Sequence, residues 1–177
     1  MQKKKILEVS NLKTYFHTKE GTVKAVNGVS FELNKGEILG IVGESGAGKS
    51  ITGFSLLRLI DPPGEIVEGE IKFKGKDLLK VNKKDMNKIR GKKISMIFQD
   101  PMASLNPVLT IGQQLMEVLI FHLNFSRKKA KKRAIELLNM VGISSTKKRI
   151  KQYPNQFSGG MRQRVVVAIA LASDPEI

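Results

Sequence analysis

The fold of this chain is decided by the stretch Gly43-Glu44-Ser45-Gly46-Ala47-Gly48-Lys49-Ser50. It fits the pattern G-x-x-x-x-G-K-[ST], in which glycines let the backbone wrap around phosphates and turn its N–H groups inward. The apolar run 37–42 predicts a buried strand before the loop, and residues 50–60 predict a helix after it. Strand, glycine-rich turn and helix is the order that the motif requires. A purely structural turn is the alternative, but it does not need a Lys-Ser pair at its end.

The residue types at the end of this loop predict its ligand. Lys49 would reach the β- and γ-phosphates of a nucleotide, and the Ser50 hydroxyl would ligate Mg²⁺. The helix that follows would add its positive N-terminal end. We therefore expect a nucleotide and Mg²⁺ at residues 43–50.

The composition is that of an ordinary globular protein. A length of 177 residues suits one domain with a real core, and 41% hydrophobic and 27% charged residues are typical values. No apolar run approaches the roughly 20 residues that span a bilayer. The chain has no cysteine, which excludes a disulfide framework and a cysteine-ligated metal site.

The charge is strongly basic, with 31 Lys and Arg residues against 16 Asp and Glu residues, a net charge of +15. Much of this excess lies in residues 127–133 and 147–149. Such runs can attract nucleic acid, an anionic membrane or a nucleotide. They have no interleaved aromatic residues and no nucleic-acid motif, so we interpret them as solvated helix and loop faces. Attraction to an anionic cytoplasmic leaflet and a compositional bias of the genome are the alternatives.

The remaining pattern runs from strands to helices. Strands are predicted over 6–12, 27–33, 70–73 and, buried, over 94–98, with a polar helical connection over 80–90. From residue 110 the chain is helical, and Thr110, Ser126 and Ser158 can cap three successive helices. The sequence therefore predicts an α/β core followed by a helical block.

A second glycine-rich segment opens the last helix and reads Phe157-Ser158-Gly159-Gly160-Met161-Arg162-Gln163-Arg164. Ser158 can cap this helix, while Gly159 and Gly160 leave backbone N–H groups open at its positive end. One nucleotide does not need two such sites in one chain, so this helix end would face the γ-phosphate of a nucleotide held by another subunit. The segment resembles the signature motif of ABC transporter ATPases, usually Leu-Ser-Gly-Gly-Gln. Phe157 and Met161 depart from it in the manner of the peptide-importer branch.

Further segments extend the resemblance. Residues 97–101 resemble the Q-loop of the family, which implies that Gln99 contacts Mg²⁺ and the hydrolytic water. Residues 100–107 and 153–157 are similar to segments of the oligopeptide/dipeptide (nickel) importer ATP-binding subunits. In the family an aromatic residue near the first strand stacks on adenine. The spacing assigns this role to Phe16, with its neighbour Tyr15 and ordinary hairpin packing as the alternatives.

The resemblance covers residues 5–177 and implies an α/β P-loop NTPase fold, the nucleotide-binding domain of ABC transporters. It implies an antiparallel β part and P-loop core over 1–100, a helical subdomain over 101–157 and a signature helix over 158–177. The implied cofactors are ATP and Mg²⁺, and the implied activity is ATP hydrolysis that powers peptide uptake. The implied partners are membrane permease subunits, a second ATP-binding subunit and, indirectly, an extracytoplasmic peptide-binding protein. This places the chain peripherally on the cytoplasmic face of the membrane, with no nucleic acid expected.

The sequence departs from the family pattern at its end. In the family, a strand with the Walker B aspartate and the catalytic glutamate follows residues 174–177, and the chain ends at Ile177. We therefore expect an incomplete core sheet and no ATPase activity from this chain alone. Two alternatives remain: a short, non-catalytic nucleotide-binding or regulatory protein, and a soluble ABC protein that acts on nucleic acid.

Overall fold

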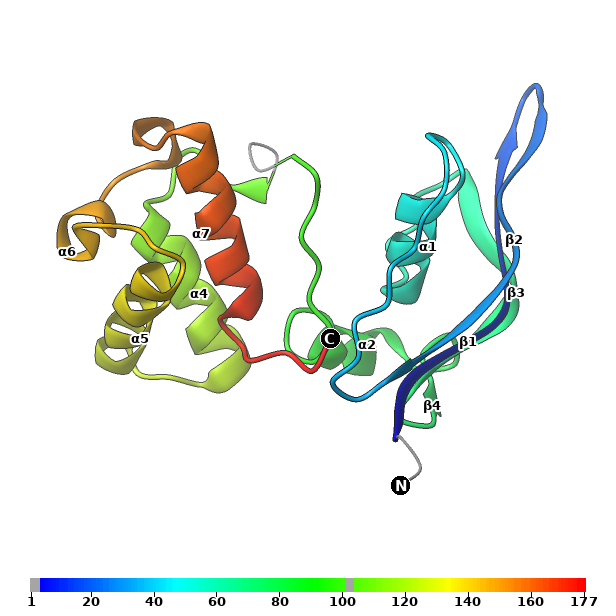
Figure 1. Ribbon diagram of the computed structural model, residues 1–177, viewed down its shortest axis with the longest axis horizontal. Coiled ribbons are helices and arrows are strands. Elements are labelled where there is room, and N and C mark those ends of the chain that lie inside the picture. The colour runs from blue at the N-terminus through cyan, green and yellow to red at the C-terminus, as the bar shows by residue number, and fades with distance from the viewer. Residues whose placement is uncertain (1–3, 101–103) are drawn as a thin grey trace. The chain divides into compact units, whose positions relative to one another are not determined.

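The computed structural model describes residues 4–100 and 104–177 (Figure 1). The chain forms two compact units, with the boundary between Met86 and Asn87. Residues 101–103, which belong to the predicted Q-loop and importer segments, lie outside the described residues. In the part of the chain that is described, no helix combines the length and hydrophobicity needed to cross a membrane.

The first unit is built on a four-stranded antiparallel sheet in the order β2-β1-β3-β4. The hairpin of β1 (Lys5–Thr18) and β2 (Gly21–Asn34) forms one side, and β3 (Gly64–Phe73) and β4 (Lys76–Asp77) continue the sheet beyond β1. This confirms the antiparallel β part. All three strands predicted here form, and each is longer than its apolar pattern indicated.

A bulge in β1 explains how this strand keeps its apolar side chains on one face. Leu7 and Val9 are buried at odd positions, whereas Leu12 and Thr14 are buried at even positions. The register shifts between Val9 and Leu12, where Asn11 adopts a φ of 47°. An extra residue in one strand reverses the alternation of side chains, so both pairs face the core.

Helix α1 (Lys49–Leu56) lies in the first unit, and α2 (Lys83–Ile89) crosses the boundary to the second. The first helix is shorter than the predicted 50–60. It is tied to the sheet by a buried hydrogen bond between the hydroxyls of Thr14 and Ser55, whose oxygens are 2.8 Å apart. This bond anchors the last turn of α1 to β1.

The buried strands predicted over 37–42 and 94–98 are wrong: neither segment forms a strand. Ile38 and Val42 are 98% and 93% exposed. In the second segment Ile94 is buried, whereas Phe98 is 44% exposed. A central strand of a parallel sheet is stabilised by backbone hydrogen bonds to neighbours on both sides and by helices on both faces. None of the described strands pairs with either segment, so most side chains of these runs lack the ladder that would bury them. Among the described residues, the sheet of the predicted α/β fold is therefore the antiparallel one alone.

The second unit is helical, as predicted (Figure 1). Its elements are α4 (Ile111–Leu123), α5 (Arg127–Met140), the short α6 (Thr146–Arg149), the 3-10 turn η1 (Pro154–Gln156) and α7 (Gly159–Leu171). Helices α4, α5 and α7 pack side by side around one apolar core. The fully buried side chains of this core include Leu115, Leu119, Leu138 and Val165.

All three predicted N-caps form. The hydroxyls of Thr110, Ser126 and Ser158 accept hydrogen bonds from the backbone N–H groups three residues further on. At Thr110 the bond is reciprocated, since the Gln113 side chain accepts from the Thr110 backbone N–H at 2.8 Å. Each cap satisfies a backbone donor that the helix itself leaves without a partner.

Candidate functional site

The glycine-rich loop leads directly into α1 and passes very close to β2. Gly48, the residue before the helix, has a φ of 81°. A Cβ atom at this position would lie 2.1 Å from the carbonyl oxygen of Ala25 in β2. Only glycine combines this left-handed conformation with so close an approach of two backbones. Gly46 also has a positive φ of 82°, but a Cβ atom there would meet nothing within 4 Å.

Lys49 closes the loop. Its Nζ donates to the carbonyl oxygens of Gly43 at 2.8 Å and Glu44 at 2.6 Å, which folds the ammonium group over the turn. In residues 43–48, the Ala47 amide donates a hydrogen bond to the Glu44 carbonyl oxygen at 3.2 Å. Within the described residues, the other amides of this stretch have no such bond. The loop thus offers unused N–H groups, an ammonium group and the positive end of α1, which together fit a phosphate group.

The predicted metal contacts come from both units. Ser50 is exposed in the first turn of α1, in the first unit, and Gln99 is exposed in the second unit. The described residues contain no cluster of three His, Asp or Glu side chains that could hold a metal ion. Mg²⁺ is commonly held by one or two protein ligands together with phosphate oxygens and water. The Ser50 hydroxyl, at the end of the glycine-rich loop, fits one such protein ligand.

Phe16 is half-buried near the end of β1. It pairs with Val23 of β2 and with Gly64 of β3. A Cβ atom on Gly64 would come within 2.5 Å of the Phe16 ring, so the ring lies directly over this glycine. The neighbouring Tyr15 hydroxyl donates to the Asn27 side chain at 2.8 Å. Phe16 therefore makes the packing contacts of a sheet residue and keeps part of its ring exposed.

The second glycine-rich segment forms the start of α7. Phe157 is buried at 3% exposure and anchors the segment in the helical core. Ser158 caps the helix, with its hydroxyl oxygen 3.4 Å from the Met161 amide. Gly159 and Gly160 are exposed, and a Cβ atom on either would meet nothing within 4 Å. The helix start thus presents open backbone amides on a fixed support.

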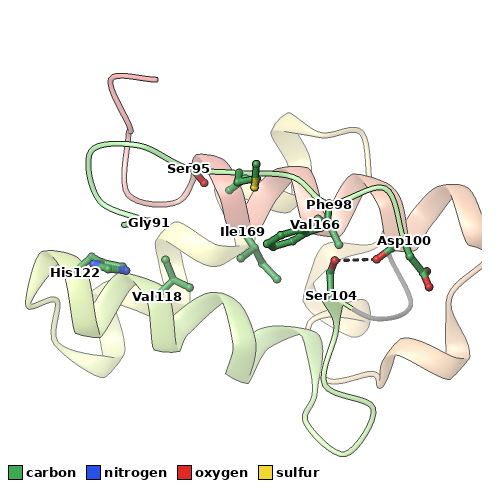
Figure 2. Close-up of a pocket in the computed structure, with 11 residues that line it drawn as sticks. Gly91, Ser95, Phe98, Asp100, Ser104, Val118, His122, Val166 and Ile169 are labelled. Carbon is green, nitrogen blue, oxygen red and sulfur yellow. Dashed lines mark hydrogen bonds between the residues drawn. The ribbon is translucent and has the colours of Figure 1, made fainter. Parts of the chain in front are cut away.

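A cavity of about 560 Å³ in the second unit was not foreseen from the sequence (Figure 2). Its mostly apolar wall includes Val118 of α4 and Val166 and Ile169 of α7, together with the extended segment around Phe98. At one end, burial lowers the pKa of His122, and the positive charge of Lys92 lowers it further. The sequence predicted helices over Val118 and Val166, but it could not show that a cavity remains between them.

Comparisons with known proteins agree with this geometry. Residues 26–177 match the family model described as ABC transporter. The oligopeptide transport ATP-binding protein OppD of Bacillus subtilis is 54% identical over 174 residues, 98% of this chain and 49% of that protein. The dipeptide transport ATP-binding protein DppD of Lactococcus lactis is 54% identical over 178 residues, 100% of this chain and 51% of that protein. The chain thus spans about half the length of the curated relatives that it matches.

Solved structures show the same fold. The dimeric structure of MJ0796, a bacterial ABC transporter cassette, aligns with a TM-score of 0.85 and 30% identity over 96% of this chain and 70% of that one. A post-hydrolysis dimer of the same cassette, bound to ADP and phosphate, aligns with a TM-score of 0.84. The family match, the relatives and the fold agree with the two glycine-rich helix starts, and this chain therefore belongs to the ABC transporter family of P-loop ATPases.

Proposed function

We propose that this chain is the ATP-binding part of an ABC importer subunit that couples ATP binding and hydrolysis to peptide uptake across the cytoplasmic membrane. The observation that carries the nucleotide part is the glycine-rich loop at residues 43–50, with its open backbone amides and the Lys49 ammonium group folded over the turn. The peptide part rests on relatives of about 54% identity whose names state oligopeptide or dipeptide transport. The open amides of a P-loop and a lysine at its end suit a nucleoside triphosphate because they neutralise its phosphate charges.

Each predicted site residue has a role in this proposal. The amides of the loop, from Gly43 to Ser50, hold the phosphates, and Lys49 neutralises the charge on the terminal ones. The Ser50 hydroxyl would hold Mg²⁺, and the Gln99 side chain would contact it as the resemblance to the family implies; the ion would supply positive charge on the phosphate oxygens. Gln99 also orients the attacking water. Phe16 would stack on the adenine, with the equally half-buried Tyr15 as the alternative.

The open start of α7 points to a shared site. We propose that Ser158, Gly159 and Gly160 bind the γ-phosphate of a nucleotide held by a second ATP-binding subunit. The similar MJ0796 cassette is dimeric in its solved structures, which supports this arrangement. The remaining proposed partners are membrane permease subunits and, indirectly, an extracytoplasmic peptide-binding protein, with the chain on the cytoplasmic face of the membrane. We also propose that these 177 residues by themselves bind ATP and hydrolyse it only negligibly.

The nucleotide site is tested by calorimetry on Lys49→Ala. Charge-assisted hydrogen bonds contribute about 1.5–3 kcal/mol each, so ATP affinity should fall about 10-fold to 100-fold. Lys35→Ala is the matched control, because Lys35 is an exposed lysine in the same unit outside the loop. An ATP affinity that is the same in Lys49→Ala and in the unmodified chain would contradict the assignment.

The transport step needs its own test. Cells that carry Lys49→Ala in the chromosomal gene should lose uptake of labelled oligopeptides or dipeptides while they keep uptake of a free amino acid. If peptide uptake is unchanged although ATP binding is lost, the chain serves another process. That result would refute the transport role and would leave the assignment of residues 43–50 as a nucleotide site unaffected.

A further inference from the structure

The positive charge of this protein is concentrated in one part of the helical unit. Residues 126–151 hold ten Lys and Arg residues and a single acidic residue, Glu136. The rest of the chain holds 21 basic and 15 acidic residues, which is a much smaller excess per residue. A compositional bias of the whole genome would spread the excess along the chain. This distribution instead indicates a local surface.

The fold turns most of this charge outward. On α5, the side chains of Ala130, Ala134 and Leu138 are buried in the core. Lys128 and Lys132 lie four residues apart on the opposite side of the helix and are exposed. The short basic helix α6 contacts α5, so the charges of both helices belong to one region. We call this region the basic face. Its members are the exposed side chains Arg127, Lys128, Lys131, Lys132, Lys147, Lys148 and Lys151.

The members of the basic face have no counter-charge in the described residues. Glu136 forms an ion pair with Arg133, with a nitrogen–oxygen distance of 3.2 Å. The other basic residues of 126–151 are also engaged: the Lys129 ammonium lies 3.9 Å from the centre of the Phe125 ring, and the Arg149 guanidinium lies 5.6 Å from that of Phe157. Lysines four residues apart on a helix repel each other, which costs stability. An external anion would relieve this repulsion.

The chemistry of the basic face favours a lipid surface over nucleic acid. Six of its seven members are lysines, whose compact ammonium groups attract diffuse negative charge, whereas the planar fork of arginine suits bidentate recognition. Proteins that bind single strands combine positive charge with aromatic rings for base stacking. Residues 126–151 contain no aromatic residue. The apolar stripe of α5 is used in the core, so the helix could lie against a surface without inserting.

We propose that the basic face binds the anionic headgroups of the membrane leaflet beside which the proposed function places this chain. The inference rests on that proposed function and adds a direct contact with lipid to it. Polybasic segments near a membrane bind anionic lipids through charge alone, and this attraction falls off within a Debye length. The binding is therefore expected to require anionic lipid and to weaken steeply as salt is added.

The test is cosedimentation of the 177-residue chain with vesicles of equal parts phosphatidylglycerol and phosphatidylcholine. The chain should bind these vesicles and should not bind vesicles of phosphatidylcholine alone. Each lysine near an anionic surface contributes about a fivefold gain in affinity, so replacing Lys128, Lys131 and Lys132 by glutamine should weaken binding about 100-fold. Glutamine is a good helix former, so α5 should keep its structure. A second triple replacement, of Lys147, Lys148 and Lys151, should have a similar effect.

A matched control carries the same change in net charge. Lys19, Lys35 and Lys76 are exposed and lie in the first unit, and their replacement by glutamine should weaken vesicle binding about fivefold or less. An equal loss in this control and in the α5 variant would overturn the proposal, because it would show a response to net charge only. Equal binding to phosphatidylcholine vesicles, or tighter binding to RNA than to anionic vesicles at the same salt concentration, would also overturn it. The α5 variant should keep its ATP affinity, and Lys49→Ala should keep vesicle binding. A failure of the lipid proposal can therefore be distinguished from a failure of the nucleotide-site assignment.

Discussion

Replacing Gly48 by alanine should damage the first unit more than any other single-methyl addition in the loop. The φ of Gly48 is 81°, and the added Cβ atom would lie 2.1 Å from the Ala25 carbonyl oxygen. Gly46→Ala is the matched control, since Gly46 has a nearly identical φ of 82° and open space around its Cβ position. The two variants share the backbone strain, and the clash with β2 separates them.

The expected changes in the free energy of unfolding follow from three terms. An alanine in the left-handed region costs about 1–2 kcal/mol, and both variants carry this cost. Relieving the contact at Gly48 requires a backbone shift of the loop or of β2, which costs about 1–3 kcal/mol more. Alanine also lowers the entropy of the unfolded chain, which offsets about 0.4–1 kcal/mol in both variants. We therefore expect a destabilisation of about 2–4 kcal/mol for Gly48→Ala and of about 1 kcal/mol or less for Gly46→Ala.

Amide hydrogen exchange measures this difference for each unit separately. The most protected amides of β1 and β2 should lose protection in Gly48→Ala, while those of α4 and α7 should keep theirs. Equal protection of the sheet amides in the two variants would refute the reasoning, because the close approach of Gly48 to Ala25 would then carry no energy. A loss of protection in both units would refute it as well, since the damage would not be local to the loop.

Three further changes test the helical unit. Leu115→Ala removes a fully buried side chain and should lower the free energy of unfolding by about 2–5 kcal/mol. Phe121→Ala is the control, because Phe121 is 71% exposed and its replacement should change this free energy by no more than about 0.5 kcal/mol. Equal shifts of the urea midpoint in the two variants would contradict the core assignment. Ser158→Ala removes the cap of α7 and should lower the stability of this helix by about 1 kcal/mol, so the Met161 amide should exchange faster. An unchanged exchange rate of this amide would show that the cap does not form. Burial lowers the pKa of His122, so the folded state favours the neutral imidazole. The contribution of His122 to stability is therefore complete above about pH 6.5, the ordinary histidine pKa, and is lost as the pH falls through the lowered pKa. His122→Gln should remove this part of the acid-side loss of stability, and an unchanged pH profile of unfolding would refute the effect.

The sequence determined the features that depend on local signals. The caps at Thr110, Ser126 and Ser158 were predicted correctly, because a hydroxyl that precedes a 3.6-residue apolar period satisfies backbone donors only three residues away. The loop at residues 43–50 was recognised from glycine and lysine spacing, and the family from motifs in their expected order. The roles of individual site residues remain predictions, since each depends on a ligand or a partner subunit.

Only the tertiary structure decided which apolar runs are buried. Residues 37–42 read as a central strand, yet Ile38 is 98% exposed, because a strand exists only through hydrogen bonds to neighbours that may lie far away in the sequence. The contact of Gly48 with Ala25, the bulge at Asn11 and the cavity beside His122 have the same origin. Helix hydrogen bonds close within four residues and can be read from the local pattern. Sheet pairing, close backbone approach and packing voids join distant segments, so they require the folded chain.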